Sequence, residues 1–271
     1  MTEQSYSQVQ VLDVVPFGNK RQEAAFFALR LSLPPWNKYL PGQFVMLRPV
    51  AGWSKRLWAR PFSICRLSKR DLVIFFQVVG EATSDLAKLS PGDTLEIWGP
   101  LGNGLCVESN TKTLLLAGGI GIAPFVGYVQ EHPAPWNLTM EFGLRTDLSC
   151  YPVDSLNEKI EIDAHIERNQ QDRENFVQLL DKRIASYADN GLVLACGPKP
   201  FLQTIQSLAK KYNTRCQLCL ESIMACGIGA CLGCVVKSNA PQNETSDGFA
   251  GEGYVQVCTC GPVFWADSVT L

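Results

Sequence analysis

The feature that most restricts how this chain can fold is a group of cysteines near its C-terminus. Cys226, Cys231 and Cys234 follow the pattern C-x4-C-x2-C, and the later stretch "VCTCGPVF" adds Cys258 and Cys260. Three thiolates on one short loop, with a fourth at a distance, are the arrangement that holds a [2Fe–2S] cluster. The C-terminal part of the chain is therefore predicted to wrap around such a cluster.

A structural zinc site is the alternative explanation of these cysteines. Zinc usually takes its four ligands as two short pairs, whereas three of them share one loop here. The residues between the three cysteines are small, so the loop can wrap closely around a cluster; they include Gly227, Gly229, Ala230 and Gly233. The spacing favours iron–sulfur, with the fourth ligand open between Cys258 and Cys260. Cys216 and Cys219 are interpreted as buried strand residues, because free cysteine is among the most buried residue types.

Length and composition indicate a multi-domain protein. The chain has 271 residues, which suits two compact domains and a small appendage. Hydrophobic residues make up 46%, charged residues 18%, and the net charge is -2, so nucleic-acid binding is not expected. No basic N-terminal region precedes an apolar stretch, and no apolar run reaches membrane-spanning length, which predicts a cytoplasmic protein without membrane contact. Eleven cysteines in such a protein indicate metal or redox chemistry.

The pattern of hydrophobic residues changes along the chain. From Val9 to about Trp98, short β-rich runs alternate with Gly, Pro, Asn and Asp, which predicts a small antiparallel β-barrel or sandwich. After Asn110, strands alternate with helices, which predicts a parallel sheet with covered faces. The predicted domains are an antiparallel β-barrel at 1–104, an α/β domain at 105–214 and a small cluster segment at 215–271.

Two stretches of the barrel region carry groups suited to a flavin nucleotide. In "RPFSI", residues 60–64, an arginine lies near a hydroxyl on a strand, which can bind a pyrophosphate and touch a flavin ring. In "VGEATSDLAKL", Gly80, Thr83 and Ser84 begin a short helix and offer N–H and O–H donors. Neither stretch is specific alone, because a surface arginine and a helix N-cap would look the same.

Two small-residue loops lie at corresponding places in the α/β region. "AGGIGIAP", residues 117–124, follows a buried strand but lacks the G-x-G-x-x-G fingerprint, and "ACGPKPF", residues 195–201, follows a later strand. Both loops are expected to face one crevice at the C-terminal edge of the sheet. Cys196 would then lie beside a nicotinamide, although a buried thiol at a strand end is the simpler alternative.

The motifs "RPFSI", "GGIGIAP", "CGPKPF", "LESIMACGIGACLGC" and "VCTCGPVF" together resemble one family along nearly the whole chain. The chain resembles the electron-transfer subunits of class 1B dihydroorotate dehydrogenase, within the ferredoxin-NADP reductase superfamily. The resemblance implies that electrons pass from NADH through FAD in the barrel and a [2Fe–2S] cluster to the FMN of a separate dihydroorotate dehydrogenase catalytic subunit. It also implies a heterotetramer of two subunits of each kind.

The resemblance also assigns roles to residues by position. It assigns the flavin and its ribityl-phosphate side to Arg60, Pro61, Phe62 and Ser63. It assigns the FAD pyrophosphate to Gly80, Thr83 and Ser84. It assigns the nicotinamide nucleotide to Gly118, Gly119, Gly121, Cys196, Gly197 and Pro198, with Cys196 as the candidate catalytic residue. It assigns the cluster to Cys226, Cys231, Cys234 and Cys258.

The sequence departs from the family in two places that matter for function. Cys260 replaces an acidic residue, which puts a spare thiol beside the cluster. The family's acidic, glycine-rich adenosine-binding stretch is not visible in "IDAHIERNQQDRENF", where Glu167 favours NADH and Arg168 favours NADPH. NADH is the preferred expectation. The alternatives are the reductase component of a sulfite reductase, oxygenase or transhydrogenase system, and a non-catalytic cluster adaptor that no longer binds NAD(P)H.

Overall fold

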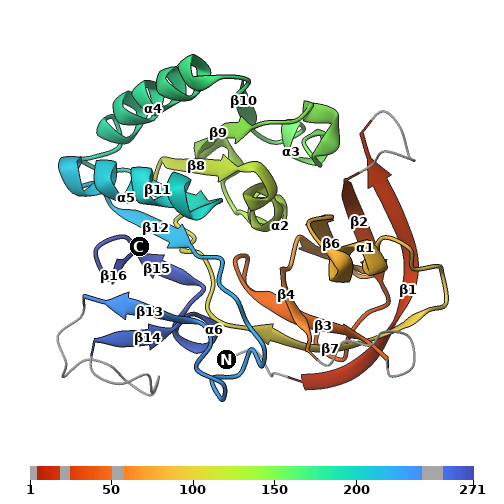
Figure 1. Cartoon of the computed structure of the whole chain (residues 1–271). Helices are drawn as coiled ribbons and strands as arrows, with labels where there is room; N and C mark the ends of the chain where they lie inside the picture. The colour runs from red at the N-terminus through yellow and green to blue at the C-terminus, as the bar shows by residue number, and fades with distance from the viewer. Residues whose placement is uncertain (1–4, 19–24, 51–57, 240–252) are drawn as a thin grey trace.

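The computed structural model describes residues 5–18, 25–50, 58–239 and 253–271, and these parts of the chain form three β-sheets (Figure 1). The sheets follow one another along the chain, from a barrel-like N-terminal sheet through a central sheet to a small C-terminal one. Among the helices described, none is both long and apolar enough to cross a membrane.

The N-terminal sheet has seven antiparallel strands in the order β4-β3-β7-β1-β2-β6-β5. Its elements are β1 (Ser5–Phe17), β2 (Phe26–Leu31), β3 (Phe44–Pro49), β4 (Arg60–Ser63), β5 (Arg66–Leu67), β6 (Leu72–Gln77), helix α1 (Glu81–Leu86) and β7 (Thr94–Leu101). The sheet curls until β4 contacts β6, although the two are not hydrogen-bonded neighbours. The predicted antiparallel barrel is confirmed as a half-barrel.

The barrel core follows from alternation along the strands. Val9 and Val11 of β1 are buried while Gln8 and Gln10, which precede each of them, are exposed, since successive strand residues point to opposite faces. A register shift in the β1–β2 pairing after Val11 interrupts this alternation. The same core takes alternate residues of the other strands, which include Leu29, Leu31, Leu72, Ile74, Leu95 and Ile97.

The central sheet has six strands in the order β10-β9-β8-β11-β12-β15, all parallel except the last. Its strands are β8 (Thr113–Gly118), β9 (Leu138–Leu144), β10 (Glu161–Ile166), β11 (Leu192–Cys196), β12 (Cys216–Cys219) and β15 (Val263–Trp265). Its helices are α2 (Ala123–Glu131), α3 (Asp154–Asn157), α4 (Gln170–Ala185) and α5 (Lys199–Tyr212). The predicted α/β domain with a parallel sheet is confirmed.

Helices cover both faces of this sheet, which explains the continuous apolar runs of its strands. Leu115 and Ala117 of β8 pack in the cluster that contains α2, whereas Leu114 and Leu116 pack with residues of α4 and α5. In Figure 1, α4 and α5 lie on one side of the sheet and α2 on the other, toward the barrel. On α2, a Cβ added to Gly127 would lie 1.9 Å from the Tyr39 hydroxyl, so the two domains pack closely there.

The C-terminal segment forms a small sheet in the order β14-β13-β16. Its elements are β13 (Val235–Ser238), β14 (Tyr254–Gln256), the short helix α6 (Val257–Cys260) and β16 (Val269–Thr270). Two strands on either side of the cysteine loop join the central sheet, since β12 pairs with β11 and β15 pairs with β12. The predicted domain limits at 104 and 214 stay predictions.

Candidate functional site

A cavity of about 630 Å³ lies where the barrel, the central sheet and the C-terminal segment meet. The barrel contributes residues 60–63, 75–77 and 79–83 to its wall. The central domain contributes Ile120, Gly121, Ala123, Cys196, Pro198 and Cys219, and the C-terminal segment contributes Leu220, Glu221, Ser222, Met224 and Pro262. Segments far apart in sequence therefore line one space, of a size usual for ligand pockets.

Strand β4 carries the barrel's predicted flavin residues. It pairs with β3, so that Ser63 lies opposite Phe44 and Arg60 opposite Leu47. The Arg60 guanidinium donates to the carbonyl oxygens of Trp58 and Ala59, at 3.3 and 3.1 Å, and these bonds hold it beside the strand end. Phe62 packs edge-on against Phe76, with ring centroids 6.2 Å apart. This wall combines an aromatic surface, a hydroxyl and a cation, which suits a flavin.

The loop before α1 uses its own polar groups to hold its shape. The Thr83 hydroxyl accepts hydrogen bonds from the backbone N–H groups of Val79 and Gly80, at 2.9 and 3.2 Å, and donates to the Gly80 carbonyl at 3.0 Å. Its proton is therefore used within the loop. Gly80 and Thr83 line the cavity, whereas Ser84 is not among the lining residues and bonds through its N–H to Gly80.

The two small-residue loops of the central domain touch, as expected from the sequence. β8 and β11 are parallel neighbours, with Ala117 opposite Cys196, so both loops leave the same edge of the sheet. A Cβ added to Gly121 would lie 2.2 Å from the Cys196 carbonyl oxygen, and one added to Gly197 would lie 3.0 Å from the Cα of Gly118. Glycine is required here because the two backbones approach so closely.

The predicted nucleotide residues separate into two groups in this structure. Gly121, Cys196 and Pro198 line the cavity. Gly118, Gly119 and Gly197 are not among its lining residues; they form the backbone of the adjoining loops.

Cys196 lies at the end of β11 and is only 3% exposed. Its thiol hydrogen-bonds to that of Cys219 at the end of β12, and this contact, together with burial, raises the pKa of Cys196. The thiol is therefore protonated at neutral pH. The simpler interpretation of Cys219 as a buried strand residue is confirmed, as is that of Cys216.

Glu221 is a cavity residue that the sequence analysis missed. It follows β12 directly and lines the space beside Cys219 and Met224. Its side chain is open to the cavity but enclosed by protein, and this burial raises the pKa of its carboxyl group. The available signal was its position just after a strand of the parallel sheet, at the edge where ligands bind.

The cysteine loop runs between β12 and β13 and turns sharply. Gly227, Gly229 and Leu232 have positive φ angles of 74°, 84° and 55°. The loop rests on the barrel, because the indole Nε1 of Trp98 donates a 2.9 Å hydrogen bond to the carbonyl oxygen of Cys226. Its other side is held by the Gln256 amide, which donates to the Gly229 carbonyl at 2.6 Å.

The four predicted ligands form two pairs of sulfur atoms. Cys231 hydrogen-bonds to Cys226, and Cys234 to Cys258. Two thiolates for each of two irons is the ligand set of a [2Fe–2S] cluster. Among the described residues, no three side chains of the metal-binding types converge as around a single ion. Two pairs of sulfur atoms are compatible with the predicted cluster, whose ligand set stays a prediction.

The loop also favours ionised sulfur. Within the Cys234–Cys258 pair, the shared hydrogen bond lowers the pKa of Cys234 to about 6 and raises that of Cys258, and the backbone N–H of Cys258 contacts the Cys234 sulfur at 3.4 Å. The backbone N–H of Gly233 is the main cause that lowers the pKa of Cys231. Because thiolates are the form that binds metal, these donors suit a cluster site.

Cys258 and Cys260 occupy different surroundings on α6. Cys258 is buried against Cys234, whereas the Cys260 sulfur contacts the Thr259 hydroxyl, at 3.8 Å. The geometry supports Cys258 as the fourth ligand, which stays a prediction.

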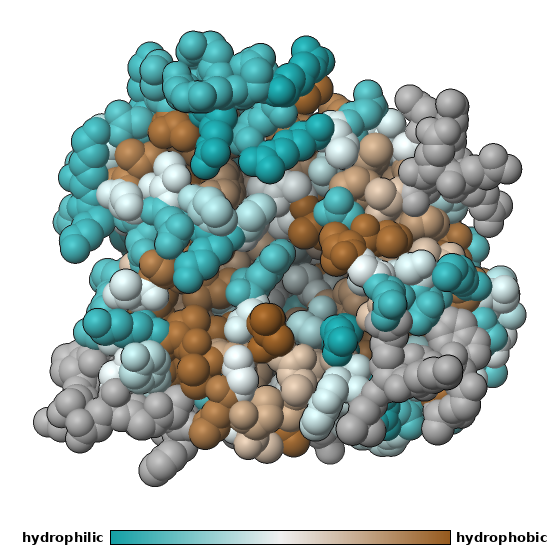
Figure 2. Space-filling model, in the orientation of Figure 1, coloured by the Kyte–Doolittle hydropathy of each residue, from teal (hydrophilic) through white to brown (hydrophobic). Residues whose placement is uncertain are grey.

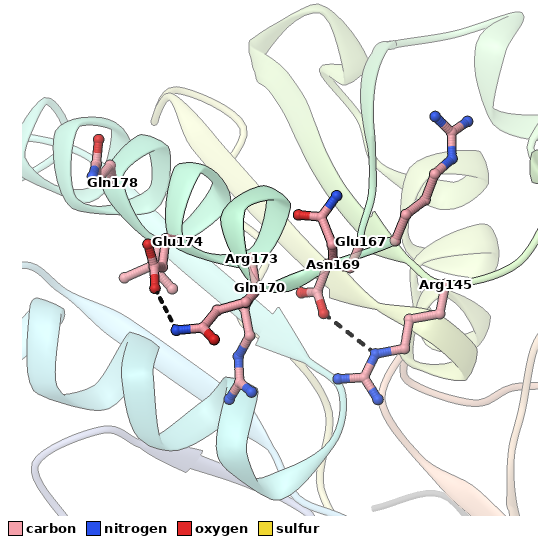
Figure 3. Close-up of a pocket in the computed structure, with 9 residues that line it drawn as sticks. Arg145, Glu167, Asn169, Gln170, Arg173, Glu174 and Gln178 are labelled. Carbon is pink, nitrogen blue, oxygen red and sulfur yellow. Dashed lines mark hydrogen bonds and ion pairs between the residues drawn. The ribbon is translucent and has the colours of Figure 1, made fainter.

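A second cavity, of about 830 Å³, lies at the start of α4 and contains the unusual nucleotide segment (Figure 3). Arg145 follows β9 and forms an ion pair of 3.3 Å with Glu167, which follows β10. In Figure 3 the guanidinium groups of Arg145 and Arg173 extend to the same side of the ribbon. Glu167 is therefore flanked by positive charge, and this cavity can hold the ribose end of a nucleotide. His132 and His165 are not among the residues that line either cavity.

Comparisons with known proteins agree with this geometry. Residues 221–270 match the model of the iron–sulfur cluster binding domain of dihydroorotate dehydrogenase B. The electron transfer subunit of dihydroorotate dehydrogenase B (NAD(+)) from Caldanaerobacter subterraneus is 35% identical over 229 residues, which cover 84% of this chain and 86% of that protein. The corresponding subunit from Listeria monocytogenes is 34% identical over 238 residues, which cover 85% and 87%.

Solved structures share the fold at lower identity. The structure of an NADH-dependent reduced ferredoxin-NADP oxidoreductase superposes with a TM-score of 0.75 at 21% identity, covering 96% of this chain and 89% of the other. Ferredoxin-NADP+ reductase from Plasmodium falciparum gives a TM-score of 0.62 at 16% identity, covering 76% and 90%. With the cavity, the paired cysteines and the relatives taken together, the chain belongs to the family of electron transfer subunits of dihydroorotate dehydrogenase B.

Proposed function

We propose that this chain takes electrons from NADH and delivers them to the FMN of a dihydroorotate dehydrogenase catalytic subunit in pyrimidine biosynthesis. When bound, FAD accepts a hydride, and the [2Fe–2S] cluster passes electrons singly to the partner. The chain's own residues then bind these groups, orient them and exclude water.

The observation that carries this proposal is the short path between the cavity and the cysteine loop. Met224 lines the cavity, and Cys226 follows two residues later, so their Cα atoms lie within about 7 Å. The cysteine loop also contacts the barrel, because the Met46 side chain of β3 lies against the loop at Gly227. A flavin in the cavity and a cluster on the loop would thus be held close together by two rigid elements.

The two walls of the cavity are proposed to bind different groups. On the barrel side, Arg60, Pro61, Phe62 and Ser63 contact the flavin, and the loop at Gly80 and Thr83 lies against its phosphates, with Ser84 supporting that loop from outside the cavity. On the opposite side, Gly121 keeps the backbone close to Cys196, whose protonated thiol faces the space where a nicotinamide meets the flavin.

The second cavity provides the nucleotide end of the site. The Glu167 carboxylate accepts a hydrogen bond from a ribose hydroxyl, which favours NADH. We assign the nicotinamide nucleotide between these cavities to Pro198, which lines the first one, and to the adjoining loop residues Gly118, Gly119 and Gly197. NADPH is the weaker donor because its 2′-phosphate would meet the Glu167 carboxylate.

The surface around the cysteine loop suits a protein partner. Hydrophobic side chains gather on the lower part of the face shown in Figure 2, around the C-terminal segment. Ile223, Ile228 and Leu232 of the loop are exposed, Ile223 to 89%. Apolar residues exposed beside a redox group mark a docking face, and we place the FMN subunit there, in a heterotetramer with two subunits of each kind. None of the eleven cysteines, all of which lie in the described parts of the chain, forms a disulfide, which supports a reducing, cytoplasmic location.

An anaerobic titration of the purified protein with NADH and then NADPH tests the relay. We expect NADH to bleach the flavin and cluster absorbance together, and to do so at lower concentration than NADPH. In the variant Cys226→Ser, NADH should still bleach this chain's flavin, but it should no longer reduce the FMN of the catalytic subunit. If neither nucleotide bleaches the flavin while dithionite does, the chain is a cluster adaptor and the proposal fails.

A further inference from the structure

The cavity wall contains two thiols side by side, and the proposed function uses only one of them. Cys196 of β11 and Cys219 of β12 are register partners in neighbouring parallel strands. Each is 3% exposed, both pack in the same hydrophobic cluster, and both line the cavity assigned to the flavin. Neighbouring strands lie about 4.8 Å apart, which falls within the Cα separation of about 4.4–6.8 Å that a disulfide requires.

The two side chains also lie on the same face of the sheet, in one hydrophobic cluster. The neighbouring Cys219 thiol is the main cause that raises the pKa of Cys196, as expected for two thiols close together. Gly121 presses against the Cys196 backbone from one side, and β15 pairs with β12 at Cys219 from the other. The pair is thus held in a fixed arrangement rather than brought together by a mobile loop.

We propose that Cys196 and Cys219 form a redox-active pair that exchanges two electrons with the flavin in this cavity. In oxidation, two S–H bonds break and one S–S bond forms, and the two electrons and two protons pass to an oxidised flavin. Reduced flavin reverses the step, so that NADH can reduce the disulfide through it. This inference rests on the placement of FAD in the proposed function.

The surroundings explain why the flavin, and not a soluble thiol, is the partner. Both sulfurs are buried from bulk solvent, and the cavity is the opening that reaches them. Burial and the contact between the thiols raise the pKa of Cys196, which slows exchange with soluble disulfides. Glu221 lines the same cavity two residues beyond Cys219, where its carboxyl group can carry a proton released from the pair.

Cys216 provides a matched control on the same strand. It is as buried as Cys219 but packs in the hydrophobic cluster on the opposite face of the sheet. A substitution there removes one buried thiol from β12 without touching the pair.

The test is an anaerobic reductive titration of air-oxidised holoprotein with dithionite, combined with thiol trapping. We expect the wild-type protein and Cys216→Ala to take up two more electrons per chain than Cys219→Ala. After acid quenching, alkylation and digestion, mass spectrometry should find Cys196 joined to Cys219 in the oxidised wild-type protein. Both cysteines should be alkylated after reduction.

Equal electron uptake by the three proteins, with both cysteines alkylated in the oxidised wild type, would overturn the proposal. The mass measurement on the wild-type chain decides the question even if Cys219→Ala folds poorly, and Cys219→Ser provides a second variant. Protein stripped of flavin, reduced and returned to air should re-form the disulfide more slowly than holoprotein, and an equal rate would remove the flavin from the step. Flavin bleaching by NADH without any disulfide would leave the proposed function intact while refuting the pair.

Discussion

The indole of Trp98, on the barrel strand β7, donates a 2.9 Å hydrogen bond to the carbonyl oxygen of Cys226, the first cysteine of the ligand loop. The two residues are 128 positions apart in the chain. This bond joins the flavin barrel directly to the cluster loop. It therefore fixes the loop relative to the cavity in which the flavin is proposed to bind.

Replacing Trp98 with phenylalanine removes this bond while keeping an aromatic ring in place. We expect the Trp98→Phe variant to lose about 1 kcal/mol of unfolding free energy, because a partly buried carbonyl loses its donor. We also expect slower electron passage from flavin to cluster, measured by rapid mixing with NADH. An unchanged passage rate in a folded variant would show that the bond has no part in positioning the loop.

The close approach of Gly121 to Cys196 gives a second prediction. In Gly121→Ala, the new Cβ would lie 2.2 Å from the Cys196 carbonyl oxygen, so one of the two loops must move. We expect the variant to lose about 1–3 kcal/mol of unfolding free energy and to be reduced slowly by NADH, while dithionite still reduces its flavin. Gly80→Ala is the stability control, because a Cβ there meets nothing within 4 Å. Equal urea unfolding of the two variants would contradict the prediction.

Much of the architecture could be predicted from local patterns. Short β-rich runs separated by turn residues predicted the antiparallel half-barrel, and strands alternating with helices predicted the parallel sheet. Both patterns can be read locally because each reflects how one element buries its own side chains. The loop at residues 226–234 was recognisable because three ligands on one loop must lie at set spacings around a cluster, with the fourth at a distance.

The remaining site residues depend on contacts that no local pattern encodes. The Trp98 indole of the barrel hydrogen-bonds to Cys226 of the C-terminal segment. Cys219 lies beside Cys196 only because the register of β11 and β12 makes them partners. Glu221 lies within the motif "LESIMACGIGACLGC", but the motif does not indicate that its side chain lines the cavity, because that position follows from where β12 ends. The Thr83 hydroxyl could be expected to bind a ligand, but it bonds within its own loop. Such details are determined by packing between segments far apart in the chain.

The charges around Glu167 predict how the donor is chosen. Removing the carboxylate in Glu167→Gln breaks its ion pair with Arg145, so a 2′-phosphate could meet the arginines of this cavity without the Glu167 charge beside it. We expect the KM for NADPH to fall about tenfold, equivalent to about 1.4 kcal/mol, and the KM for NADH to rise. Glu174→Gln makes the same change of net charge in the same cavity. A similar fall in that variant would mean that overall charge, and not the Glu167 position, selects the nucleotide.

The ion pair between Glu108 and Arg215 predicts a dependence of stability on pH. Arg215 donates two hydrogen bonds to this carboxylate, at 2.6 and 3.1 Å, and lowers the pKa of Glu108 from 4.5 to about 2. The pair therefore stabilises the folded state fully above pH 4.5, and its contribution is lost as the pH falls from there toward 2.

The Glu108→Gln variant tests this contribution. Because both side chains are partly exposed, we expect it to lower the unfolding free energy at neutral pH by only about 0.2–1 kcal/mol. The difference from the wild type should shrink as the pH is lowered below 4.5, as measured by urea unfolding at several pH values. A difference that stays constant down to the lowest pH would contradict the ion pair as its source.

The two cysteines of α6 give the sharpest test of the cluster site. Cys258 is buried and contacts Cys234, whereas Cys260 contacts a threonine hydroxyl. We therefore expect Cys258→Ser to lose most of its iron and the cluster absorbance, while Cys260→Ser keeps both. The flavin should bind normally to each variant, because neither residue lines its cavity. If Cys258→Ser retains a cluster that disappears only when Cys260 is also replaced, the spare thiol can substitute as ligand, and the fourth position is shared between them.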